Sequence, residues 1–332
     1  MTFPEFNKQN KFNFHLNNIK KLISDTNLLA QIPDFMPKLN HFYTREDKAG
    51  WWMATKQIVL RHYINEYLTI LGKRKYINLF FIDLLSHYGM NKVTKRGTKD
   101  QFNFPGSTIN AVIVSISKQR GFSKIYSNDY DLDRRIVLSK RLDCIKKHIN
   151  SSLDFEINTD DKNKDSNIWV IKVINEIRNN NRYSNYLIII DNEGMNIEYN
   201  TIKKIREVHP YGDIIINFQD VGVNRNLKPN PQKIKKFFGI QINPTTKKDS
   251  LCDIYIEQLK KIGFGRIEKL KIASKTGFYY TLLFCCREDV SGNWLEMIKY
   301  YRDDRFKSWT DEDVKRMWDV AMDKSMTLED FK

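Results

Sequence analysis

The sequence has few of the features that mark a disulfide-stabilised or metal-binding protein. It contains only four cysteines among 332 residues. These are Cys144, Cys252, Cys285 and Cys286. None of their spacings is the Cys-x-x-Cys pattern of zinc or redox motifs, and the six histidines include no His-Glu-x-x-His pair. We therefore expect buried free thiols and no metal site.

Long apolar runs are also absent. The longest apolar stretch, residues 77–85, is interrupted by Asn78 and Asp83, whereas a membrane helix needs roughly 20 apolar residues in succession. Residues 1–15 lack the apolar core of a signal peptide. We therefore expect no membrane association and a cytoplasmic location. The Gly-x-Gly-x-x-Gly fingerprint is missing too, which argues against a nucleotide-dependent oxidoreductase.

The chain does have an excess of positive charge. Lys and Arg number 55 against 40 Asp and Glu, which gives a formal net charge of +15. Such an excess favours a polyanionic partner, because neutralised phosphates release their counterions. The alternative is a charge that serves solubility alone. The hydrophobic content of 41% is that of a globular protein, so a folded chain is expected.

Short apolar segments and amphipathic segments alternate along the central part of the chain. Strands are predicted over residues 76–83, 124–129, 154–158, 186–191 and 213–218. Helices are predicted over residues 47–71, 106–120, 132–149, 167–179, 197–208 and 249–262. This alternation predicts an α/β fold with five parallel strands and helices on both faces. Residues 266–273 and 278–286 then predict an antiparallel hairpin.

Helical segments flank this central unit. Apolar residues at helical spacing between Leu16 and Ile32 predict an N-terminal helical extension over residues 1–45. A capping box at residues 310–313 belongs to a predicted C-terminal helical tail over residues 291–332. A Rossmann-like domain is expected over residues 46–290. A sheet whose last strand turns back antiparallel resembles the layout of class I S-adenosylmethionine-dependent methyltransferases.

Polar residues follow the first predicted strand, at the edge where open α/β sheets bind their ligands. Asp83 ends this strand, and Ser86 and Gly89 are small enough to let backbone N–H groups approach a nucleotide. His87 and Tyr88 between them are bulky, and only one glycine is present. An ordinary strand-to-helix loop is therefore the alternative.

Acidic residues follow the next three strands. Asp129 and Asp131 can accept hydrogen bonds from both hydroxyls of a ribose, and Asp160 lies where an acid often contacts adenine. Asp191 and Glu193 follow the fourth strand, the catalytic corner of this architecture, and could act as general base or orient a target amine. Helix capping and solvated loops are the alternative roles for all five.

Three segments concentrate basic residues. Residues 92–99 and 225–236 contain no acid, and residues 299–307 interleave aromatic rings with Arg and Lys. Charge beside stackable rings suits single-stranded or flipped-base nucleic acid, although each segment could also be a solvated surface. The predicted nucleic-acid contacts are Lys92, Lys95, Arg96, Lys99, Arg225, Lys228, Arg302 and Arg305.

The order of these segments resembles that of the three-Cys-motif partner proteins, a methyltransferase-like family. Residues 52–68 resemble the opening helix of the family, with Gln57 in place of its usual His. Residues 83–89 resemble its Asp-Leu-Phe-Ala-Gly-x-Gly segment, with one glycine lost. Gly106 and Ser107 match the start of its Gly-Ser-Pro helix, and residues 191–194 stand where it has Asp-Pro-Tyr-Gly. The resemblance extends over residues 47–300.

The resemblance implies a methyltransferase-type Rossmann fold with S-adenosylmethionine as cofactor. Gly106 and Ser107 would join Asp83, Ser86, Gly89, Asp129, Asp131 and Asp160 at that cofactor. A further implied partner is a protein with a three-Cys motif, of the radical S-adenosylmethionine type. The leading hypothesis is a methyltransferase that acts on nucleic acid, DNA or RNA. The alternative, suggested by the lost glycine, is a catalytically decayed fold that binds nucleic acid or a partner in a defence or modification complex.

Overall fold

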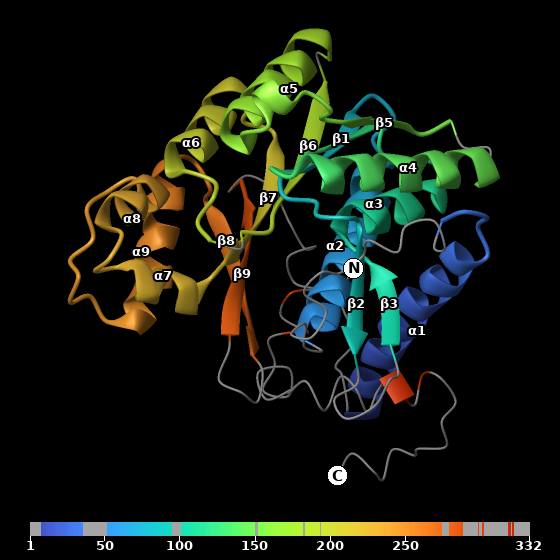
Figure 1. Ribbon diagram of the computed structural model, residues 1–332, viewed down its shortest axis with the longest axis horizontal. Coiled ribbons are helices and arrows are strands. Elements are labelled where there is room, and N and C mark those ends of the chain that lie inside the picture. Colours follow the sequence, from blue (N-terminus) through green and yellow to red (C-terminus); the bar gives the residue numbers. More distant parts are fainter. Residues whose placement is uncertain are drawn as a thin grey trace.

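The centre of the protein is a seven-stranded sheet with strand order β5-β4-β1-β6-β7-β9-β8 (Figure 1). The computed structural model describes residues 8–35, 52–94, 101–149, 152–181, 183–192, 194–273 and 279–287, with residues 298, 301, 318, 319 and 321. The strands are β1 (Asn78–Asp83), β4 (Lys124–Ser127), β5 (Asp154–Ile157), β6 (Ser184–Ile190), β7 (Gly212–Phe218), β8 (Arg266–Ala273) and β9 (Tyr279–Cys286). Strand β9 is antiparallel to β7 and β8, and the other pairs are parallel. The predicted fold class is confirmed.

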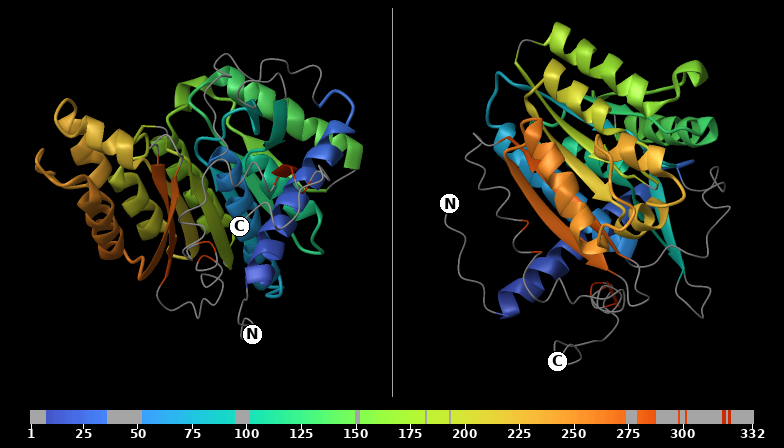
Figure 2. Two further views of the ribbon diagram at one scale, coloured as in Figure 1. Left: turned by 90° about the horizontal axis from the view of Figure 1, so that it is seen from below. Right: turned by 90° about the vertical axis from the view of Figure 1, so that its left-hand side faces the viewer.

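Helices cover both faces of this sheet (Figures 1 and 2). One core packs the sheet against α2 (Trp52–Leu71), α3 (Ser107–Ile116) and α4 (Leu132–Ile149). The other core packs it against α5 (Ser166–Asn180), α6 (Tyr199–Val208), α7 (Asp220–Asn226), α8 (Pro231–Phe238) and α9 (Lys248–Lys261). Along β1, Phe81 enters the first core and Phe80 the second. Because both faces are buried, these strands have nearly continuous apolar sequences.

A second, two-stranded sheet is inserted between β1 and α3, and the sequence did not predict it. It consists of β2 (Met90–Thr94) and β3 (Gln101–Pro105), which pair antiparallel. Helix α1 (Lys8–Ala30) lies beside this hairpin (Figure 2). Ile19 and Leu22 of α1 pack in one cluster with Val93, Phe104 and Trp318. The N-terminal helix therefore covers an insertion that leaves the carboxyl end of β1.

The described helices include none that is long and apolar enough to cross a membrane. The four cysteines are free; Cys252, Cys285 and Cys286 are buried as expected, whereas Cys144 is only half-buried on α4. Six predicted site residues lie outside the described part of the chain. These are Lys95, Arg96, Lys99, Glu193, Arg302 and Arg305.

Candidate functional site

A buried polar network joins the loops that follow β1, β4 and β5. Its centre is Asn128, whose Nδ2 donates to Ser166 Oγ at 2.8 Å and to the Lys164 carbonyl at 3.0 Å. The Asn128 Oδ1 accepts from Asn158 Nδ2 at 2.9 Å, and Ser166 Oγ donates to the Leu84 carbonyl at 2.6 Å. Because hydrogen bonds are strong in a buried environment, this network holds the carboxyl ends of three strands in a defined arrangement.

Asp83, at the end of β1, is fully buried and faces the first turn of α3. Its Oδ2 accepts hydrogen bonds from Ser107 Oγ and, at 2.8 Å, from Thr108 Oγ1, and its Oδ1 accepts from the Leu85 N–H at 3.3 Å. Burial raises the pKa of Asp83 to about 6 in spite of these donors. The structure thus brings the predicted residues Asp83 and Ser107 together, and they fasten α3 to the end of β1.

The predicted loop residues Ser86, Gly89 and Gly106 also contact protein groups. Ser86 Oγ donates to the Asn128 carbonyl at 3.0 Å. The Gly106 N–H donates to the Gly89 carbonyl at 2.7 Å, and a Cβ on Gly106 would lie 2.9 Å from that oxygen. Gly89 has a φ of 78°, and a Cβ there would lie 2.5 Å from Leu138 Cδ1. Close packing at the base of the β2–β3 hairpin therefore requires glycine at both positions.

His87 occupies the position at which the resembled family has its first loop glycine. Its φ is 53°, so its backbone has the left-handed conformation that glycine adopts readily. Its N–H donates to Asp129 Oδ2 at 2.9 Å. The backbone shape of a glycine loop is therefore retained, and an imidazole is added to it.

The two predicted ribose acids differ in exposure. Asp129 is 4% exposed, and its Oδ1 accepts from the Asp131 N–H at 3.0 Å and from Arg134 at 3.5 Å. Its Oδ2 accepts from the His87 N–H, so protein groups already occupy much of the hydrogen-bond accepting capacity of Asp129. The Asp131 side chain is 48% exposed, and its Oδ1 accepts from the Asp133 N–H. Asp131 is thus the acid that is open to a ligand.

Asp191, just after β6, is the half-buried centre of a charged cluster. Lys56 from α2 forms an ion pair with its Oδ2, and Asn217 from β7 donates to its Oδ1 at 2.7 Å. Burial alone would raise the pKa of Asp191, but the Lys56 charge and the hydrogen bonds from Lys56 and Asn217 lower it below its usual value. Asp191 is therefore ionised at neutral pH.

His87 lies close enough to this cluster for its charge to be influenced by Asp191 and Lys56. Burial, followed by the nearby Arg134 charge, lowers the pKa of His87 to about 4. The imidazole is therefore neutral where Asp191 is an anion. A neutral ring beside a fixed carboxylate can exchange hydrogen bonds with a ligand without introducing a second charge.

Two buried amide atoms beside Asp191 have no hydrogen-bond partner among the described residues. They are Oδ1 of Asn217 and Nδ2 of Asn192. Asn192 Oδ1 accepts from the N–H groups of Asn196 and Ile197, at 3.1 and 3.2 Å, so only its amino group is left. Unsatisfied buried polar atoms are uncommon, so each requires an explanation, such as a catalytic role or a bound water. The Asn217 Oδ1 acceptor and the Asn192 Nδ2 donor therefore remain unpartnered at the carboxyl edge of the sheet.

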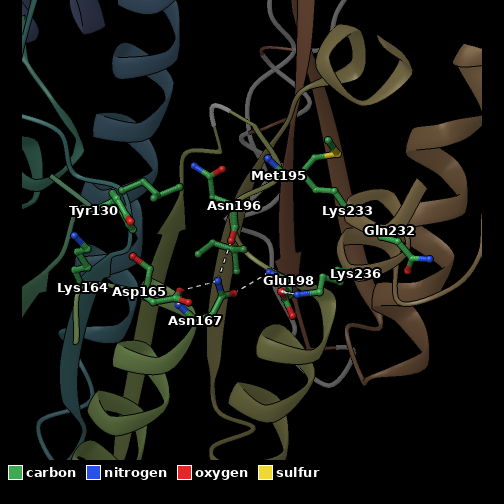
Figure 3. Close-up of a pocket in the computed structure, with 13 residues that line it drawn as sticks. Tyr130, Lys164, Asp165, Asn167, Met195, Asn196, Glu198, Gln232, Lys233 and Lys236 are labelled. Atoms are coloured by element: carbon green, nitrogen blue, oxygen red, sulfur yellow. Dashed lines mark hydrogen bonds and ion pairs between the residues drawn. The ribbon is translucent and has the colours of Figure 1, made fainter. Parts of the chain in front are cut away.

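A cavity of about 690 Å³ opens at this edge (Figure 3). Leu85 from the loop after β1, Tyr130 from the loop after β4 and residues 195–198 from the loop after β6 all line it. The first residues of α5 and the first turns of α8 complete its wall. Its volume is in the range of ordinary ligand sites. The loops after the first, second and fourth predicted strands therefore reach one cavity, but none of the predicted site residues that the structure describes is among the residues that line it.

Positive groups border this cavity. Lys164 Nζ lies 4.5 Å from the centre of the Tyr130 ring, and Lys233 and Lys236 line the opposite side (Figure 3). Asn167 Oδ1 accepts from the Glu198 N–H at 2.9 Å, which joins the N-terminus of α5 to that of α6. Helix N-termini carry partial positive charge, and here the Asp165 carboxylate accepts from the Asn167 N–H while Glu198 pairs with Lys236 at 3.0 Å. Lys164 and Lys233 are the lining cations that form no ion pair with these two acids.

The remaining predicted residues lie elsewhere. Asp160 caps the 3₁₀ helix η3 (Asp161–Asn163) by accepting from the Lys162 N–H at 2.9 Å, and it lines a different cavity of about 260 Å³. Lys92 is half-buried on β2, whereas Arg225 on α7 and Lys228 just after it are exposed. Both segments follow strand ends at the carboxyl edge.

Sequence reasoning did not single out several residues of this site. Lys56 stood in the resemblance to the family's opening helix, and Lys233 and Lys236 stood in the basic segment 225–236, but none was named as a contact. Asn217 had no signal, because a polar residue near the end of a buried strand is common. Tyr130 stands between the two predicted ribose acids, and this position is the clue that could have identified it.

No protein-family model and no curated protein matches the sequence. Among solved structures, a DUF519-family protein from Legionella pneumophila has a TM-score of 0.43 and 14% identity, over 72% of this chain and 88% of that one. Trm1 from Pyrococcus horikoshii, solved with S-adenosylmethionine, has a TM-score of 0.41 and 13% identity, over 73% of this chain and 57% of that one. An O-methyltransferase from Bacillus cereus, solved with S-adenosylhomocysteine, has a TM-score of 0.39 and 10% identity, over 82% of this chain and 91% of that one. These are similarities of fold, and the three-Cys-motif family stays a prediction.

Proposed function

We propose that this protein binds S-adenosylmethionine at the carboxyl edge of its sheet and methylates a nucleic acid. The observation that carries the proposal is the single cavity of about 690 Å³ shared by the loops after β1, β4 and β6. Open α/β sheets bind nucleosides at this edge. The methyltransferase-like fold is compatible with many activities, so the proposal depends on the residues of the site.

Tyr130 in the lining of the cavity, and Asp131 and Asn192 on two of the loops that reach it, fit a nucleoside cofactor. Tyr130 is 65% exposed and offers a ring on which an adenine can stack. Asp131 offers an exposed carboxylate for the ribose hydroxyls, next to the structural Asp129. The unpartnered Nδ2 of Asn192 offers a donor to an acceptor atom of the ligand. When bound, the cofactor supplies an electrophilic methyl group on a sulfonium.

Asp191 and Asn217 would then orient the acceptor. An ionised Asp191 and the unpartnered Oδ1 of Asn217 can each accept a hydrogen from an amino group, which aims its lone pair. Lys56 holds Asp191 in place from α2. Alignment of this kind supplies most of the rate in group transfer, and Asp191 can receive the proton that the amine loses.

The charges around the cavity support a nucleic-acid substrate. Lys233 and Lys236 line the side away from Tyr130, where Lys236 pairs with Glu198 at 3.0 Å, and the exposed Arg225 and Lys228 belong to the same basic segment of the sequence. A phosphate backbone on these groups would bring a displaced base towards Asp191. A partner with a three-Cys motif stays part of the proposal on the strength of the sequence resemblance.

The test combines calorimetry with detection of the product. S-adenosylmethionine should bind the wild-type chain, and Tyr130→Ala should weaken binding at least roughly fivefold, since stacking on an aromatic ring is worth about 1–3 kcal/mol. Ile136→Ala is the control, because Ile136 is an exposed apolar side chain on α4 that does not line the cavity. Mass spectrometry of digested DNA and RNA should then reveal a methylated nucleoside that Asp191→Asn fails to produce.

A second candidate, a binding module without turnover, is favoured by one specific observation. His87 fills the glycine position, and its N–H already occupies Asp129. If no heat of S-adenosylmethionine binding is detected up to millimolar ligand while nucleic acid still binds, the module is correct and the enzyme is rejected.

A further inference from the structure

A second cavity, of about 490 Å³, lies at the opposite edge of the sheet, where the parallel strands begin. Ser184 at the start of β6 and Gly212 at the start of β7 line it, together with Arg287, which directly follows the antiparallel β9. The proposed methyl transfer uses none of these residues. The size of the cavity is sufficient for a small ligand.

Three arginines border this cavity: Arg74, Arg178 and Arg287. Arg74 and Arg178 are exposed, and within the described part of the chain neither forms an ion pair. The Arg287 guanidinium lies 4.6 Å from the centre of the Tyr211 ring. Guanidinium groups bind phosphate oxygens through paired hydrogen bonds, so Arg74 and Arg178 at one opening favour a phosphorylated ligand.

Exposed tyrosines share the same opening. Tyr76, Tyr183 and Tyr211 are 66%, 55% and 46% exposed, and all three line the cavity. The rings of Tyr76 and Tyr183 meet edge to face with centroids 6.1 Å apart. Large exposed rings are unfavourable in water, and a nucleobase can cover them by stacking.

The floor of the cavity presents a donor and an acceptor. The Tyr67 side chain is 1% exposed, and its hydroxyl has no hydrogen-bond partner. Burial raises its pKa well above the usual value, and the nearby Asp213 carboxyl raises it further, so the hydroxyl remains protonated. Asp213 accepts a hydrogen bond from Tyr63 at 2.9 Å and retains further accepting capacity. A hydroxyl donor beside a carboxyl acceptor matches the polar edge of a nucleobase.

The geometry points to a nucleotide site at the amino edge of the sheet. The base lies among the tyrosines with its edge towards Tyr67 and Asp213, and the phosphate lies on Arg74 and Arg178. The same chemistry is offered by a free nucleotide and by the 5′-phosphorylated end of a nucleic-acid strand. This site does not depend on the methyltransferase proposal, because the two cavities lie at opposite edges of the sheet.

Calorimetry on the full chain tests this site with defined probes. They are the four ribonucleoside 5′-monophosphates, inorganic phosphate and 5′-phosphorylated trinucleotides. The double variant Arg74→Ala/Arg178→Ala should weaken nucleotide binding by roughly tenfold or more, because it removes two charged donors. The control Lys140→Ala/Lys147→Ala removes the same charge from exposed positions of α4 and should have little effect. Tyr76→Ala should weaken nucleotide binding and leave phosphate binding unchanged.

The outcomes separate the sources and can reject the site. Tighter binding of a trinucleotide than of any mononucleotide identifies a strand end, and equal binding identifies a free nucleotide. The site is overturned if no nucleotide binds at millimolar concentration, if the arginine and lysine variants lose affinity equally, or if phosphate binds as tightly as nucleotides. Displacement of the nucleotide by S-adenosylmethionine would place it in the other cavity and would also overturn the proposal.

Discussion

The backbone N–H of His87 donates to Asp129 Oδ2 at 2.9 Å, and this contact joins the loop after β1 to the loop after β4. It depends on the left-handed φ of 53° at His87, which a histidine adopts at a cost of roughly 1–2 kcal/mol. The backbone of His87 therefore joins the two loops, whereas its imidazole is the addition to a glycine-like loop.

His87→Gly should increase the affinity for S-adenosylmethionine, because it removes the imidazole and keeps the backbone conformation. The free energy of unfolding should change by less than about 1 kcal/mol, since relief of strain is offset by greater freedom of the unfolded chain. Calorimetry and urea unfolding give the two quantities. Asp34→Gly is the control for stability, because it relieves a φ of 63° at a residue far from His87 in sequence. Unchanged or weaker cofactor binding in His87→Gly would show that the imidazole does not obstruct the cofactor.

Asp191→Asn should lower the free energy of unfolding by about 2–3 kcal/mol, because it leaves the Lys56 charge buried without a partner. The Lys56 side chain is only 7% exposed, whereas that of Asp191 is 21% exposed, so solvent moderates the loss. The double variant Lys56→Met/Asp191→Asn should be more stable than the summed losses of Lys56→Met and Asp191→Asn predict. Urea unfolding of the wild type, the two single variants and the double variant measures this coupling, and strictly additive losses would refute it.

Gly89→Ala should destabilise the protein by about 3 kcal/mol. The alanine would have to keep the positive φ of Gly89, and its Cβ would lie 2.5 Å from Leu138 Cδ1. Backbone strain and overpacking therefore both destabilise the variant. Gly222→Ala is the matched control, since Gly222 lies in α7 with 3.4 Å to Gln219 Cβ and no positive φ. That change should be neutral or stabilising by up to about 1 kcal/mol. Thermal unfolding of both variants checks the contrast.

Asp213→Asn should alter how stability depends on pH. Burial raises the pKa of Asp213 to about 6, so the folded protein binds this proton more tightly than the unfolded chain does. The contribution of Asp213 to stability is complete below about pH 4 and is lost as pH rises through about 6. The free energy of unfolding that is lost in this way is roughly 3 kcal/mol. His87 and His209, whose pKa values burial lowers to about 4, act in the opposite direction as pH falls from 6.5.

The comparison of the two proteins isolates Asp213 from these histidines. The difference in unfolding free energy between Asp213→Asn and wild type should increase in favour of the variant between pH 4.5 and pH 7.5. Denaturant unfolding at several pH values measures it. A difference that stays constant over this range would contradict a raised pKa at Asp213.

Local sequence was sufficient for the sheet, because strands buried on both faces and helices with one apolar side leave distinct periodicities. The segments around Phe80 and Ile188 and the closing hairpin were predicted correctly for this reason. The β2–β3 hairpin was not predicted, because its strands are short and polar and are stabilised by contacts with α1 and Trp318. Helix α8 was likewise not predicted, because it lies largely within the basic segment 225–236, and the short helix α7 before it was not predicted either.

The sequence by itself determined which polar residues would reach the carboxyl edge, since that depends only on where parallel strands end. It identified Asp83, Asp129 and Asp191 in this way. Only the tertiary structure decided what their carboxylates contact: Asp83 anchors α3, Asp129 holds the His87 loop, and Asp191 pairs with Lys56. Strand position is encoded locally, whereas a hydrogen-bond partner comes from a distant segment and is selected by packing.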